Sequence, residues 1–160
     1  RCHFHFIHSI HIISLLNTYM KDAYTTAFYD VVKDSQAKSG MELPHHIEAY
    51  IVMLLSEFVD RNDIPPDSTF AEMFLSIKDA RQAKQLGDTC LFVSGAFPKL
   101  KASHGINRRY YQDIGSTSYD MASGMNEELF PVLAKHFVFL SEFIEITVNS
   151  PKLTHNNLFR

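Results

Sequence analysis

Apolar side chains recur at intervals of three and four residues along most of the chain, which is the spacing of an amphipathic α-helix. This spacing continues over 20–148 with short interruptions, and alternation typical of a strand occurs only over 3–7. Amphipathic helices bury their apolar stripes by packing together around a shared core. The sequence therefore predicts an all-α fold, a compact bundle of about five or six helices that forms a single domain.

Glycine, proline and capping residues divide this pattern into separate helices. Gly40 is expected to end the first helix and Pro44 to start the second. Asp67 or Ser68 is expected to cap the third helix, and Asn107 the fourth. Whether the third stretch is one helix or two stays open. Helices are expected over 20–39, 43–61, 68–97, 108–122 and 127–148.

The first 19 residues differ from the rest in composition. They hold four of the nine histidines (His3, His5, His8 and His11) and no acidic residue, and an ordinary helical pattern starts only after Met20. A signal peptide or a membrane span fits poorly, because the apolar run is short and is interrupted by histidines. Metal binding by the histidines is a further alternative, but the segment offers no carboxylate ligand. We expect a non-native or disordered extension over 1–19, a helical domain over 20–150 and a C-terminal tail over 151–160.

The composition is that of an ordinary globular protein, with 46% hydrophobic residues, 21% charged residues and a net charge of −3 at pH 7. The densest basic stretch holds Lys99, Lys101, Arg108 and Arg109, and it is too broken to favour nucleic-acid binding. Two cysteines make no disulfide framework, and Cys90 lies in an apolar pattern typical of a buried residue. We expect a cytoplasmic protein with no membrane partner.

Two neighbouring segments have a distinctive pattern. The first is LGDTCLFVSGAFP over 86–98, and the second is RYYQDIGSTSYDMAS over 109–123. Together they resemble a group of uncharacterised bacterial all-helical proteins that carry a "GD–LF–G–F" segment followed by a "YY–G–SY" segment. The resemblance extends over about 43–145 and implies an all-helical fold and a bacterial cytoplasmic setting. It implies no activity and no catalytic residue.

Three glycines, Gly87, Gly95 and Gly115, stand inside predicted helices, where glycine costs about 1 kcal/mol relative to alanine. A compensating interaction is therefore expected at each position. The favoured interpretation is close helix crossing, because a missing side chain lets two backbones approach. The alternative is that the glycines leave room for a ligand.

Asp88 follows one of these glycines in an apolar helical pattern and is the main candidate for chemistry. A buried carboxylate must be paired or hydrogen-bonded, and the candidate ligand-binding set is Asp88, Tyr110, Tyr111 and Tyr119, with His136 or Glu48 as further members. The favoured interpretation is a structural Asp–Tyr hydrogen bond. Proton transfer would need a cleft and a raised pKa of the carboxyl group.

Other catalytic and cofactor motifs are absent from the sequence. Glu42 and His45 have the E-x-x-H spacing of di-iron bundles, but Pro44 interrupts the motif and no second copy exists. No phosphate-binding glycine loop and no hydrolase elbow occurs. His136 is expected to be a core histidine on the last helix, which Pro131 is expected to kink. The sequence thus predicts no cofactor and no metal.

Two hypotheses about function remain. The first is a non-enzymatic protein-interaction or regulatory module, expected to be a homodimer or a small adaptor, because catalytic motifs are missing and aromatic helix faces are abundant. The second is a small-molecule or metal-binding bundle, and possible enzyme, with its site around Asp88. The oligomeric state tests the first hypothesis, and a cavity beside Asp88 would favour the second.

Overall fold

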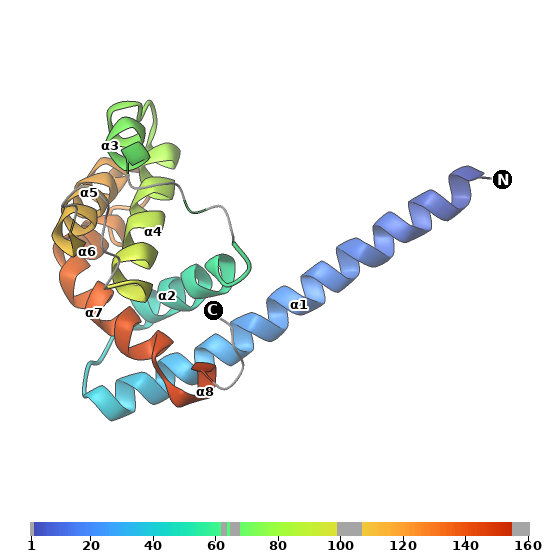
Figure 1. The fold of residues 1–160 in the computed structure, drawn as a ribbon, viewed down its shortest axis with the longest axis horizontal. Helices are drawn as coiled ribbons and strands as arrows, with labels where there is room; N and C mark the ends of the chain where they lie inside the picture. Colours follow the sequence, from blue (N-terminus) through green and yellow to red (C-terminus); the bar gives the residue numbers. More distant parts are fainter. Residues whose placement is uncertain (1, 62–63, 65–67, 99–106, 155–160) are drawn as a thin grey trace.

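A computed structural model describes residues 2–61, 64, 68–98 and 107–154 (Figure 1). Within these residues it contains helices and no strand, which confirms the predicted all-α single domain. The described part of the chain contains eight α-helices, more than the five or six expected, because two of the predicted helices are broken and a short one is added. The elements are α1 (Cys2–Ser39), α2 (His45–Phe58), α3 (Ser68–Leu75), α4 (Ala80–Ala96), α5 (Arg108–Met121), the 3₁₀ helix η1 (Ser123–Met125), α6 (Phe130–Lys135), α7 (Phe137–Val148) and α8 (Pro151–Thr154).

Helix α4 is the central element of the bundle. It packs most extensively against α5 and α7 and also contacts α2 and α3. Eleven of its 17 residues are buried, so it is enclosed on most sides rather than along one stripe. A helix covered in this way needs apolar or small residues around its circumference, which α4 supplies over its second half.

The three glycines lie where helices cross closely, which confirms the favoured interpretation. A Cβ atom at Gly87 would lie 2.6 Å from the ring of Tyr119 on α5. A Cβ atom at Gly115 would lie 2.3 Å from the ring of Phe137 on α7, and one at Gly95 would lie 2.6 Å from Ile144 on the same helix. These distances are shorter than van der Waals contact, so only glycine fits without a shift of the neighbouring helix.

Several predicted helix ends are confirmed by cap geometry. Gly40 has a φ of +70° and ends α1, and its amide donates to the carbonyl of residue 36. Asn107 caps α5, with its side-chain oxygen accepting from the Tyr110 amide at 3.2 Å. The open question over 68–97 is decided by Asp79, which accepts from the Gln82 amide at 2.8 Å and starts α4 as a separate helix. The alternative cap Asp67 lies outside the described residues.

The last predicted helix is broken, and the break changes the environment of His136. The chain leaves helical geometry at His136 (φ −104°, ψ 19°), which separates α6 from α7. Pro131 lies in the first turn of α6 and does not kink a longer helix. His136 is exposed, so its interpretation as a core histidine is wrong. In a continuous helix, residues spaced three or four apart share one face. Because the helix is interrupted at His136, this spacing does not place its side chain on the buried face.

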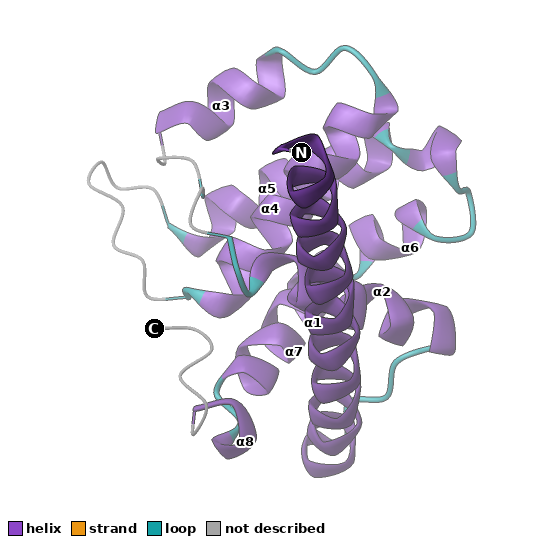
Figure 2. Cartoon of the chain, turned by 90° about the vertical axis from the view of Figure 1, so that its right-hand side faces the viewer, coloured by secondary structure: helices purple, strands orange, loops and turns teal. Residues whose placement is uncertain are grey.

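Helix α1 has two different halves. Its C-terminal half packs against α2 and α7 and buries Phe28, Val31 and Val32. Its N-terminal half extends away from the bundle (Figure 1), and in Figure 2 this half points toward the viewer in front of the other helices. The helix is continuous from Cys2, so it begins upstream of Met20, where the sequence places the start of the first helix. Whether the extension belongs to the native chain stays a prediction.

The C-terminal region continues the bundle a little beyond the domain limit expected from the sequence. Helix α8 follows α7 closely, and its Leu153 is buried in the core. Among the described residues, the helices include no apolar stretch of the length needed to cross a lipid bilayer.

Candidate functional site

Asp88 lies in a buried polar cluster formed by α2, α4 and α5. Its Oδ1 accepts hydrogen bonds from the Tyr50 hydroxyl at 2.5 Å and the Tyr119 hydroxyl at 2.8 Å. Its Oδ2 pairs with the Lys84 ammonium, one helical turn earlier, at 2.6 Å. The Asp88 cluster (Lys84, Asp88, Tyr50 and Tyr119) therefore satisfies both carboxylate oxygens with three donors.

The tyrosines of the Asp88 cluster are held in their protonated form. Burial, and then the negative charge of Asp88, raise the pKa of Tyr50 well above the ordinary value of 10. The same causes raise the pKa of Tyr119, which is fully buried. Both hydroxyls consequently act as hydrogen-bond donors and not as bases. This arrangement supports a structural role that fixes how three helices pack.

The structure brings together only part of the predicted Asp88 site. Tyr119 donates to the carboxylate as predicted, and Tyr50, which is not in the predicted set, also donates to it. Tyr111 is buried, and its ring packs edge to face against Phe70 and against Tyr110. The signal for Tyr50 was available, since a tyrosine on the strongest apolar stripe needs a partner for its hydroxyl.

A concave surface is present elsewhere, where the α1–α2 corner faces the α6–α7 junction. It consists of two adjoining cavities of about 320 and about 400 Å³ that share Glu42 and Leu43, and we call the pair the Glu48 groove. The smaller cavity is apolar and is further lined by Pro44, Ile47, Val132, His136, Phe139 and Leu140. The larger cavity is polar and is further lined by Lys33, Gln36, Ala37, His45 and Glu48. Asp88 lines neither cavity.

Glu48 is the buried charge of this groove, with 2% of its surface exposed. Its Oε2 accepts from Gln36 Nε2 at 2.5 Å and pairs with Lys33 Nζ at 2.8 Å. Gln36 is oriented by its own carbonyl oxygen, which accepts from the Leu43 amide at 2.7 Å. Burial acts to raise the pKa of Glu48, but the hydrogen bonds from Lys33 and Gln36 outweigh it, so the pKa lies below its ordinary value.

The other oxygen of Glu48 is not satisfied. Oε1 is buried and makes no hydrogen bond within the part of the chain that the structure describes. The imidazole Nδ1 of His45 lies 3.6 Å away, which is beyond hydrogen-bonding distance. Among the described residues, Glu48 thus has a buried acceptor without a donor on a side chain that lines the polar cavity, whereas the sequence pattern suggested it only as an accessory to Asp88.

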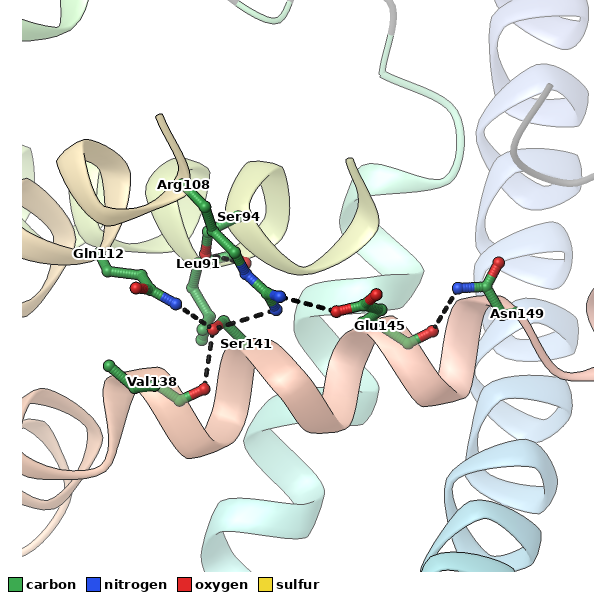
Figure 3. Close-up of polar contacts among 8 residues, drawn as sticks. All are labelled: Leu91, Ser94, Arg108, Gln112, Val138, Ser141, Glu145 and Asn149. Atoms are coloured by element: carbon green, nitrogen blue, oxygen red, sulfur yellow. Dashed lines mark hydrogen bonds and ion pairs between the residues drawn. The ribbon is translucent and has the colours of Figure 1, made fainter. Parts of the chain in front are cut away.

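A second polar network joins α5 to α7 (Figure 3). Arg108 donates to Glu145 Oε2 at 2.7 Å, and Gln112 donates to the Ser141 hydroxyl at 2.9 Å. Ser141 in turn donates to the Val138 carbonyl at 2.8 Å. These bonds lie along the crossing of two helices and stabilise their packing.

The basic stretch expected from the sequence is partly neutralised within the domain. Arg108 is engaged by Glu145, and exposed Arg109 lies 3.7 Å from Asp113. Lys99 and Lys101 lie outside the described residues. The described part of this stretch therefore presents no free pair of arginines to a phosphate backbone.

Metal binding and thiol chemistry find little support in the described residues. They include no group of three or more His, Cys, Asp or Glu side chains placed to hold a metal ion. Glu42 and His45, the E-x-x-H pair, are exposed at the Glu48 groove. Cys90 is buried, and burial raises the pKa of its thiol above the ordinary value of 9.0, so the nucleophilic thiolate is disfavoured.

The chain matches no protein-family model, and no curated protein or solved structure is significantly similar to it. The resemblance of 86–98 and 109–123 to bacterial helical proteins thus depends on the sequence pattern alone.

Proposed function

We propose that the protein is a non-enzymatic interaction module that forms a homodimer through the N-terminal half of α1. The observation that carries the proposal is a helix that leaves its own domain while keeping apolar side chains. Leu15 and Tyr19, one turn apart, are 59% and 73% exposed, and Met20 is also exposed. An apolar helix surface of this kind is typical of a protein interface.

A second copy of the chain is the occupant that fits this surface best. No Asp, Glu, Lys or Arg occurs between Cys2 and Met20, so two copies can lie side by side without placing like charges together. A two-fold axis would bring the same face of each helix to the interface. Nineteen helical residues extend about 28 Å, which is long enough for several layers of side chains.

The alternative function, ligand binding or catalysis at Asp88 and its tyrosines, has less support. Both oxygens of the Asp88 carboxylate already accept hydrogen bonds, and its neighbouring hydroxyls are locked as donors. A substrate would have to displace these contacts before it could reach the carboxylate.

Analytical ultracentrifugation over a range of concentrations tests the dimer. We expect the wild-type chain to sediment as a dimer. The double variant Leu15→Lys, Tyr19→Lys should raise the dissociation constant of the dimer at least about tenfold, because each chain would bury two added charges in the interface. Leu75→Lys is the matched control, since Leu75 is 83% exposed on α3 and should tolerate the charge.

A wild-type protein that stays monomeric at all concentrations would contradict the proposal. So would a control variant that dissociates as readily as the double variant. Circular dichroism of both variants should retain the helical signal, because the substituted side chains lie outside the core.

A further inference from the structure

The Glu48 groove contains a buried acceptor for which the described residues provide no donor. Oε1 of Glu48 makes no hydrogen bond in the described chain, although the side chain is almost fully buried. Leaving such a group unsatisfied is costly, and the cost is larger for a charged group. A ligand that donates a hydrogen bond at this point would remove the cost.

The charges of the groove favour a cation. Two carboxylates, Glu42 and Glu48, line the polar cavity, and only one permanent cation, Lys33, lines it with them. Lys33 pairs with Oε2 and offsets the charge of one carboxylate, so with His45 neutral the charged side chains of the lining carry one net negative charge. The described residues offer no set of three metal ligands, which favours an organic cation over a metal ion.

The adjoining apolar cavity defines the rest of the ligand. It shares Glu42 and Leu43 with the polar cavity, and its volume of about 320 Å³ lies within the range of small-molecule sites. Ile47, Phe139 and Leu140 give it an apolar wall contributed by two different helices. A molecule that spans both cavities would therefore have a charged end and an apolar body.

We propose that the Glu48 groove binds a small organic amine, with its ammonium group donating to Oε1 of Glu48 and its apolar body in the cavity between α2 and α6–α7. The carboxylate provides orientation through a charge-assisted hydrogen bond, and the apolar wall provides contact area. The site is separate from the exposed half of α1, so it does not depend on the proposed dimer.

Isothermal titration calorimetry with 2-phenylethylamine and its neutral analogue 2-phenylethanol tests the proposal. We expect saturable binding of the amine and at least about tenfold weaker binding of the alcohol, since only the ammonium pairs with Glu48. Glu48→Gln should weaken amine binding at least about tenfold. Glu57→Gln is the matched control, because Glu57 is an exposed glutamate on the same helix outside the groove, and it should bind like the wild type.

A second variant keeps the test independent of the folding of Glu48→Gln. Val132→Phe fills the apolar cavity from α6 and leaves the carboxylate unchanged, so it should also weaken amine binding at least about tenfold. Equal binding of amine and alcohol, no saturable binding of the amine, or unchanged binding by Val132→Phe would overturn the proposal. The α1 variant Leu15→Lys, Tyr19→Lys should bind the amine like the wild type, which separates this site from the dimer.

Discussion

At the scale of single residues, the contacts of three glycines explain positions that look unfavourable in the sequence. Gly87, Gly95 and Gly115 lower the intrinsic stability of their helices, yet each lies against a side chain of a crossing helix at less than contact distance for a Cβ atom. The gain is a closer approach of α4, α5 and α7, which buries more apolar surface than an alanine-bearing helix could.

Gly115→Ala should lower the free energy of unfolding by about 2 kcal/mol, because the added methyl group would overlap the ring of Phe137 and the Cβ of Cys90. Urea denaturation followed by circular dichroism measures the change. Gly124→Ala is the control, since a Cβ there meets nothing within 4 Å, and its effect should stay within about 0.5 kcal/mol. Equal effects at the two positions would show that close packing is not the reason for glycine.

At the scale of elements, the α1–α2 corner is held by a compact set of polar contacts. Lys33 and Gln36 on the last turns of α1 both reach Oε2 of Glu48 on the first turn of α2. Gln36 also holds the connecting loop through the Leu43 amide, and Gly40 provides the reversal of the chain. The corner therefore depends on the ionised form of one buried carboxyl group.

The pKa of Glu48 leads to a pH-dependent prediction. Because its pKa in the folded protein lies below the ordinary value of 4.5, the unfolded state binds more protons, and ionised Glu48 stabilises the fold above this pH. We expect Glu48→Gln to be less stable than the wild type at pH 7, with a difference that shrinks as the pH falls below 4.5 through the folded-state pKa. Urea unfolding of both proteins along a pH series measures this difference. A difference that is constant with pH would mean that the carboxylate does not stabilise the corner.

At the scale of the whole molecule, distant parts of the chain meet at α4. The Asp88 cluster joins α2, α4 and α5, with hydrogen bonds that span 38 and 31 residues of sequence. Contacts of this kind define how the helices pack, and they place a charged group beside a mainly apolar core.

Asp88→Ala should lower the free energy of unfolding by about 3 kcal/mol, because it leaves two tyrosine hydroxyls and Lys84 without their acceptor. Thermal unfolding monitored by circular dichroism or calorimetry measures the loss. Asp113→Ala removes an exposed aspartate that pairs with Arg109 at 3.7 Å and should cost less than about 1 kcal/mol. Similar losses in both variants would argue against a special role for the buried cluster.

Much of the fold and part of the Asp88 cluster could be predicted from the sequence, but the Glu48 groove could not. The apolar periodicity, the glycine at residue 40 and the asparagine at residue 107 identified helices and helix ends, because these signals act within a few residues. The periodicity did not predict the break at His136, because the apolar spacing continues across it while the backbone leaves helical geometry. It overlooked the cap at Asp79, although the residue type was a sufficient signal.

By itself, the sequence determined that the chain forms amphipathic helices and where several of them end, since both depend on the local conformation of the backbone. Only the tertiary structure decided that the glycines serve close packing and that Tyr50 and Tyr119 converge on Asp88. It also showed that Glu48 has a buried oxygen without a donor among the described residues, and that half of α1 lies outside the bundle. These features depend on contacts between residues far apart in the chain, which local periodicity does not encode.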